Sequence, residues 1–154
     1  MVLTFEELLA YVDEERAKWD AWFRGHPREA ATAAWPLLDH LFVTELRHTQ
    51  RIRVEYPLPE STGVAPGDWD ALWQWSVVTR RKMLGVYRGL DEARAAGAIL
   101  VPLMGEMCSV TPRKLLFHVL IHETRHWAQV ASVLRAAGFE PPGRHDFVFS
   151  SAIQ

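Results

Sequence analysis

Three histidines at four-residue intervals constrain the fold of this chain more than any other feature of its sequence. His118, His122 and His126 lie within an apolar run. A helix turns by roughly 100° per residue, so each histidine stands about one turn from the next on the same face. That face also carries Leu115 and Val119, which marks it as a core face. A buried imidazole needs a partner, so the stretch predicts a helix that packs against a second element carrying one.

A metal ion bound by two of these histidines is the partner that the spacing favours. A single core histidine is more often satisfied by a backbone carbonyl or a buried water, but several adjacent rings without a shared partner are costly to bury. His118 and His126 lie about 12 Å apart along a helix axis, so they cannot bind one ion together. The spacing predicts two ligands from this helix and at least one from elsewhere.

Composition excludes several other classes of protein. The chain has 154 residues, of which 49% are hydrophobic, and the seven Trp and seven Phe argue against disorder. The net charge of −2 gives no general attraction to nucleic acid or to an anionic membrane. Cys108 is the lone cysteine, which excludes an intrachain disulfide and a cysteine-rich zinc module. The start of the chain lacks a signal peptide and no apolar run spans a membrane, so we expect one cytoplasmic domain over residues 1–154.

Apolar residues at helical spacing, punctuated by Gly and Pro, predict four long helices. Thr4 and Glu7 form a capping-box pattern, Asp68 is a helix N-cap, and Thr111 precedes a proline at a first helical position. The expected helices cover residues 4–23, 28–53, 68–96 and 111–137. The fold class is therefore all-α, a four-helix bundle with a long crossover, or a short hairpin, between the third and fourth helices.

The second predicted helix contains three candidate residues for the metal site: His40, Glu45 and His48. Projected onto a helix, Glu45 and His48 fall within the apolar stripe and His40 falls at its edge. Periodicity alone favours His48 as the additional ligand. Glu45 has two interpretations: it pairs with Arg47 or Arg51 on its own helix, or it orients a ligating histidine through a hydrogen bond.

Two segments resemble a known family. The pattern from His118 to Gln129, with the following Leu134–Pro142, resembles the C-terminal signature of the DinB/YfiT-like superfamily. The segment Leu37–Glu45 is similar to the second helix of that family. The family usually has Arg-Gly-Gln or a similar triplet where this chain has Trp127-Ala128-Gln129. Together with the helix order, the resemblance spans most of the chain.

The resemblance implies a four-helix bundle that binds a divalent metal ion through three histidines, one from the second helix and two from the fourth. By position these are His40, His122 and His126, which differs from the His48 that periodicity favours. His118 corresponds to a family histidine outside the coordination sphere, with a packing or supporting role. Zn²⁺ is the expected ion, with Ni, Co, Mn or Fe as alternatives, because imidazole ligands alone do not select among them.

Three neutral imidazoles leave an open coordination position, the arrangement of a catalytic zinc site. Some characterised relatives use it to join low-molecular-weight thiols, such as bacillithiol or mycothiol, to electrophiles. The resemblance thus implies a thiol S-transferase of the detoxification type that acts on a small molecule. A metal-dependent hydrolase and a non-catalytic, stress-related metal- or ligand-binding bundle are the alternatives. Glu123 is a candidate base only if its face of the helix lines the pocket.

Partners are predicted only in outline. Apolar and aromatic surface on such a bundle can support a homodimer, which is common in the family. A membrane partner is not expected. Nucleic-acid binding is disfavoured, because the net charge does not indicate a basic face.

Overall fold

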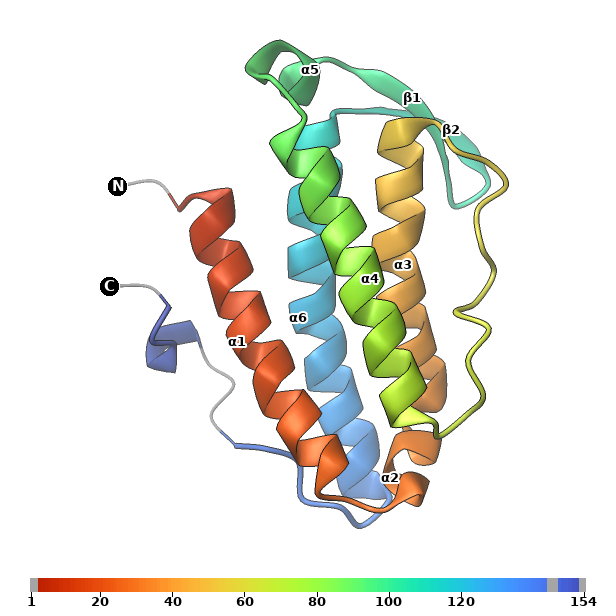
Figure 1. The fold of residues 1–154 in the computed structure, drawn as a ribbon, viewed down its shortest axis with the longest axis vertical. Helices are drawn as coiled ribbons and strands as arrows, with labels where there is room; N and C mark the ends of the chain where they lie inside the picture. The colour runs from red at the N-terminus through yellow and green to blue at the C-terminus, as the bar shows by residue number, and fades with distance from the viewer. Residues whose placement is uncertain (1–2, 144–146, 153–154) are drawn as a thin grey trace.

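The computed structural model describes residues 3–143 and 147–152 and is mainly helical (Figure 1). Its elements in chain order are α1 (Phe5–Arg24), α2 (Arg28–Ala33), α3 (Trp35–Arg53), α4 (Trp69–Arg88), α5 (Glu92–Ala96), β1 (Ile99–Leu103), β2 (Glu106–Val110), α6 (Pro112–Ala136) and the 3₁₀ turn η1 (Phe147–Phe149). The four long helices α1, α3, α4 and α6 lie side by side as a bundle, which confirms the predicted all-α class.

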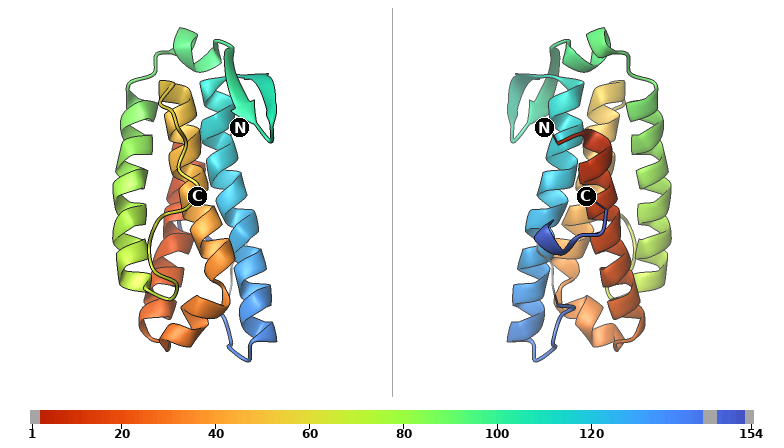
Figure 2. Two further views of the ribbon diagram at one scale, coloured as in Figure 1. Left: turned by 90° about the vertical axis from the view of Figure 1, so that its right-hand side faces the viewer. Right: turned by 90° about the vertical axis from the view of Figure 1, so that its left-hand side faces the viewer.

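The long helices are connected in two different ways. Helix α3 packs against both α4 and α6, and α1 packs against α4 and α6 on the other side. Residues 54–68 return along the length of the bundle, so α3 and α4 run in the same direction (Figures 1 and 2). The connection from α4 to α6 stays at one end of the bundle. It contains α5 and the β1–β2 hairpin, so the hairpin form predicted for this segment is the one present, and the lengthwise crossover falls one connection earlier.

Side-chain caps begin three of the long helices where the sequence predicts them. Thr4 and Glu7 form a reciprocal capping box at α1. The Asp68 side chain accepts a hydrogen bond from the backbone of Ala71, and the Thr111 side chain accepts one from Lys114. Each cap satisfies a backbone N–H that the first helical turn cannot pair. The predicted helix starts at 4, 68 and 111 are thereby confirmed.

Two predicted helices are shorter than expected. The helix predicted over 28–53 is broken at Ala34, because Pro36 near the start of α3 lacks an N–H and its ring would clash with the preceding turn. The helix predicted over 68–96 ends at Arg88 with Gly89 as its cap. A separate short helix then starts at Asp91, whose side chain caps it.

The hairpin is tied to the bundle. Antiparallel pairing runs from Ile99 opposite Val110 to Leu103 opposite Glu106. Met104 and Gly105 form the turn with φ of 50° and 86°, the left-handed pair that suits the twist of a two-residue hairpin loop. Arg51 of α3 donates a hydrogen bond of 2.8 Å from Nε to the carbonyl oxygen of Pro102. The hairpin therefore lies against the C-terminal end of α3.

The core consists of two apolar clusters, one toward each end of the bundle. The first is rich in tryptophan and includes Trp19, Trp69 and Trp127. The second includes Phe5 and Met83. Across the described ranges, no helix is both long and apolar enough to cross a membrane.

Candidate metal centre

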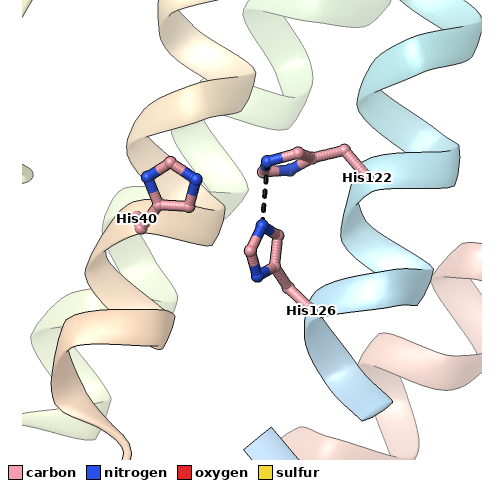
Figure 3. A group of neighbouring side chains, drawn as sticks. All are labelled: His40, His122 and His126. Atoms are coloured by element: carbon pink, nitrogen blue, oxygen red, sulfur yellow. Dashed lines mark hydrogen bonds between the residues drawn. The ribbon is translucent and has the colours of Figure 1, made fainter. Parts of the chain in front are cut away.

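Three histidines from two antiparallel helices converge on one point between α3 and α6 (Figure 3). His40 comes from α3, whereas His122 and His126 come from successive turns of α6. One nitrogen of each ring lies within 4.8 Å of a nitrogen of the other two. Nε2 of His122 and Nε2 of His126 are 2.9 Å apart, and the ring of His40 lies 5.2 and 4.9 Å from their centroids. The structure thus brings together the three residues that the family resemblance implied.

His48 and His118 form a neighbouring pair further along the same two helices. Their ring centroids are 5.1 Å apart, and His118 lies 5.5 Å from the ring of His122. Because α3 and α6 are antiparallel, eight residues along α3 carry His48 about 12 Å beyond His40 and opposite His118. His48 is buried, as its place in the apolar stripe predicted, and His40 is exposed. On α3, the buried histidine is therefore His48, whereas the histidine that joins the three-histidine group is His40.

The three converging rings are held in the neutral form, which is the form that binds metal ions. Burial, together with the neighbouring His126 and His40, lowers the pKa of His122 to about 3. Burial also lowers the pKa of His40 and of His126, and nearby Arg47 and His40, respectively, add to the effect. Protons therefore compete poorly with a metal ion for these nitrogens near neutral pH.

The donor set fits a divalent metal ion. Nitrogens that share a tetrahedral zinc at about 2.1 Å lie about 3.4 Å from one another. The ligand nitrogens of the three histidines all lie within 4.8 Å of one another, and the close pair at 2.9 Å shares a single hydrogen bond between two neutral rings. Three histidines with the remaining side open to a cavity match a catalytic site rather than a closed structural one.

Glu45 and Glu123, the carboxylates predicted to support the site, pair with arginines rather than with the three histidines. Both are buried in an ion cluster at the centre of the bundle, with Arg16 from α1 and Arg80 from α4. Arg16 donates from Nε to Glu123 at 2.5 Å and from Nη2 to Glu45 at 2.9 Å. Arg80 Nη2 lies 2.6 Å from Glu123 and 3.3 Å from Glu45. Glu45 therefore pairs with arginines of other helices, not with Arg47 or Arg51 of its own.

The ion cluster joins the two helices of the metal centre. Each arginine bridges Glu45 of α3 and Glu123 of α6, and Trp127 donates a further hydrogen bond of 3.2 Å to Glu123. Burial opposes ionisation of Glu123, but the guanidinium groups of Arg16 and Arg80 hold its pKa below the ordinary value. Burial raises the pKa of Glu45, whose Oε1 has no hydrogen-bond partner among the described residues. Of the two carboxylates, Glu123 therefore binds the arginines more strongly than Glu45 does.

A cavity of about 610 Å³ opens beside the histidines. His40, His48, His118 and His122 line it. Arg47, Arg51 and Lys114 also line it, as do apolar residues of the hairpin and of the start of α6: Leu103, Met104, Val110 and Leu115. A larger cavity of about 720 Å³ near Phe5 and Tyr87 has no histidine in its lining.

Sequence reasoning missed the three cations and the hairpin wall. On α3 the residues at positions 40, 44, 47, 48 and 51 follow helical spacing and all line the cavity. The spacing of these residues in the sequence could therefore have predicted that Arg47 and Arg51 line the cavity. The hairpin residues gave no such signal, because their contact with the bundle joins segments far apart in the sequence.

The comparison with known families bears on the same region. The model of the DinB family matches residues 91–151, which contain α5, the hairpin and α6 with two of the converging histidines. Over these residues the chain is similar to the DinB family. Searches of curated proteins and of solved structures returned no match. The matched segment excludes α3, so the position of His40 rests on the geometry. The match and the three-histidine group are compatible with a metal-binding protein.

The departure from the family pattern at Trp127 is explained by packing. Its ring stacks on Trp19 with centroids 5.0 Å apart, and it is buried. Trp127 therefore supports the core and, through its hydrogen bond to Glu123, the ion cluster.

Proposed function

We propose that this chain is a DinB-like protein that binds a divalent metal ion, with zinc as the first choice, through His40, His122 and His126, and that it is a thiol S-transferase. The observation that carries the proposal is the convergence of three neutral imidazoles beside a cavity large enough for a small molecule. A bound metal ion lowers the pKa of a thiol that coordinates it, so that the sulfur reacts as a thiolate.

The residues of the chain have defined tasks in such a transfer. The three histidines hold the ion and stay neutral, and the hairpin and α3 shape the space where the second substrate binds. With an alkyl halide as electrophile, the thiol loses its proton to solvent and the sulfur forms a new bond to carbon. The carbon–halogen bond breaks, and the halide leaves with the electron pair.

Hydrolysis with water in place of the thiol is the nearest alternative. Glu123, the carboxylate beside a ligand in sequence, points into the ion cluster, and no carboxylate is among the described residues that line the cavity. A carboxylate base for an attacking water is therefore not provided there. This observation favours a nucleophile such as a thiol, which the metal activates without a base.

A metal analysis followed by a thiol assay tests the proposal. We expect about one zinc per chain in wild-type protein purified without chelators, and consumption of a low-molecular-weight thiol in the presence of monochlorobimane. Both properties should be lost in His122→Ala and kept in the control His26→Ala, because His26 lies outside the cavity. Zinc binding without turnover across several thiols and electrophiles would support a non-catalytic bundle, and an absence of bound metal would contradict the whole proposal.

A further inference from the structure

The cavity beside the histidines is lined by an excess of positively charged side chains. Arg47 and Arg51 reach it from α3, and Lys114 reaches it from the start of α6. None of these three forms an ion pair with a carboxylate of the described residues. Among the described residues that line the cavity, none is a carboxylate that could balance them. Positive charges gathered around one cavity without a counter-charge attract an anion.

The two arginines are held in place by backbone contacts that leave donors free for a ligand. Arg47 donates to the carbonyl oxygens of Pro59 and Glu60 through Nε and Nη2. Arg51 donates to Pro102 through Nε. Nη1 of Arg47 and Nη2 of Arg51 make no hydrogen bond to any described residue. Pre-positioned guanidinium groups suit carboxylate or phosphate oxygens, because little side-chain freedom is lost on binding.

Part of the cavity wall is apolar. Leu103 and Met104 approach from the hairpin, and Leu115 approaches from α6. Met104 is fully exposed, although a polar residue such as asparagine is favoured at a position with φ of 50°. A large apolar side chain at the mouth of a cationic cavity matches a ligand that has both an anionic group and an apolar body.

We infer that the substrate bound beside the histidines of this protein carries a carboxylate or phosphate group held by Arg47, Arg51 and Lys114, and an apolar part that lies against the hairpin. The inference rests on the proposed function for the identity of the site, and it adds the chemical class of the substrate. The volume of about 610 Å³ lies within the range of small-molecule sites.

Two thiols of equal length provide the test with zinc bound. Calorimetric titration compares 3-mercaptopropionate, which has a carboxylate, with the neutral 3-mercapto-1-propanol. We expect the wild-type protein to bind the carboxylate about tenfold more tightly, the ratio that one charge-assisted hydrogen bond supplies. Lys114→Gln should reduce this preference about threefold, because Lys114 is exposed. Lys114→Glu should abolish it.

The matched control is Lys82 of α4, an exposed lysine that does not line the cavity. Lys82→Gln and Lys82→Glu make the same charge changes and should leave the preference intact. Neither Lys82 nor Lys114 forms a side-chain hydrogen bond or ion pair with a described residue, so these variants should fold. Equal affinity of the wild type for the two thiols, or an equal loss in the Lys82 variants, would overturn the inference.

A second arm separates failure of the inference from failure of the proposed function. Metal-free protein is titrated with 3-phenylpropionate and with the neutral 3-phenyl-1-propanol, so the charge preference is measured without zinc. If zinc does not bind but the carboxylate preference and its dependence on Lys114 persist, the metal proposal is wrong and the anion site stands. Acetate and inorganic phosphate as competitors distinguish the two anionic groups, since the preferred group displaces the ligand at the lower concentration. No displacement by either would also overturn the inference.

Discussion

His40 and His48 stand two turns apart on α3 and differ in what surrounds them. His48 is buried against His118, whereas His40 is exposed and approaches His122 and His126. A metal ligand has to lie close to the other ligands of the ion, and burial in the apolar stripe does not by itself bring a side chain there. The position of the opposing helix decides which histidine of α3 joins the three-histidine group.

We expect His40→Ala to lose bound zinc and His48→Ala to retain about one zinc per chain. His48→Ala should still lower the free energy of unfolding by about 1–3 kcal/mol, because it truncates a buried side chain. Metal analysis of both purified variants, with unfolding by urea as the second measurement, checks this expectation. Loss of zinc from His48→Ala together with retention by His40→Ala would show that the ligand from α3 is His48.

At the scale of the elements, the four long helices are joined by one charged residue each. Arg16, Glu45, Arg80 and Glu123 lie between the two apolar clusters and connect α1, α3, α4 and α6. Removing one member of a buried ion pair leaves its partner charged and without compensation, which costs far more than losing a surface pair. The cluster therefore fixes how α3 and α6 face each other, and with them the histidines.

Glu123→Gln should lower the free energy of unfolding by about 3–5 kcal/mol, because Arg16 and Arg80 lose one of the two buried carboxylates that they share. Glu45→Gln should cost less, since Glu45 accepts fewer and longer contacts. Urea unfolding monitored by circular dichroism measures both changes. Glu92→Gln is the control, because the ion pair of Glu92 with Arg113 is exposed and is worth under about 1 kcal/mol. A loss for Glu123→Gln no larger than that of the control would contradict the role of the cluster.

At the scale of the whole molecule, buried neutral histidines make stability depend on pH. Burial and the nearby Arg51 and His118 lower the pKa of His48 to about 3, against about 6.5 in an unfolded chain. Below pH 6.5 the side chain of His48 binds a proton in the unfolded chain but not in the folded state. The folded state is therefore destabilised as the pH falls from about 6.5 toward 3, by at most about 1.4 kcal/mol per pH unit for each such histidine.

Metal-free protein should thus lose stability between pH 7 and pH 5, and His48→Gln should show a shallower loss. Urea unfolding at half-unit steps of pH measures the slope. The wild type and the variant share the carboxylates of the ion cluster, including Glu45 with its raised pKa, so the difference between the two slopes isolates the contribution of His48. An identical slope in wild type and His48→Gln would mean that His48 is not the neutral buried group described here.

The sequence by itself determined the helical class, three of the four long-helix starts and the pair of histidines on α6. These features depend on local spacing and capping, which act within a few residues of the chain. Pro36 and Gly89 were local signals as well, and their effects at Ala34 and after Arg88 could have been predicted from the same rules. The extent of the helices was thus within reach of the sequence.

Only the tertiary structure decided what those helices place together. It set His40 opposite His122 and His126, turned Glu45 and Glu123 inward to arginines of other helices, and placed the hairpin against α3. Each of these contacts joins residues distant in sequence, and it depends on the relative rotation and direction of two packed elements. Periodicity within one helix cannot supply that information, because it describes a face without specifying what the face meets.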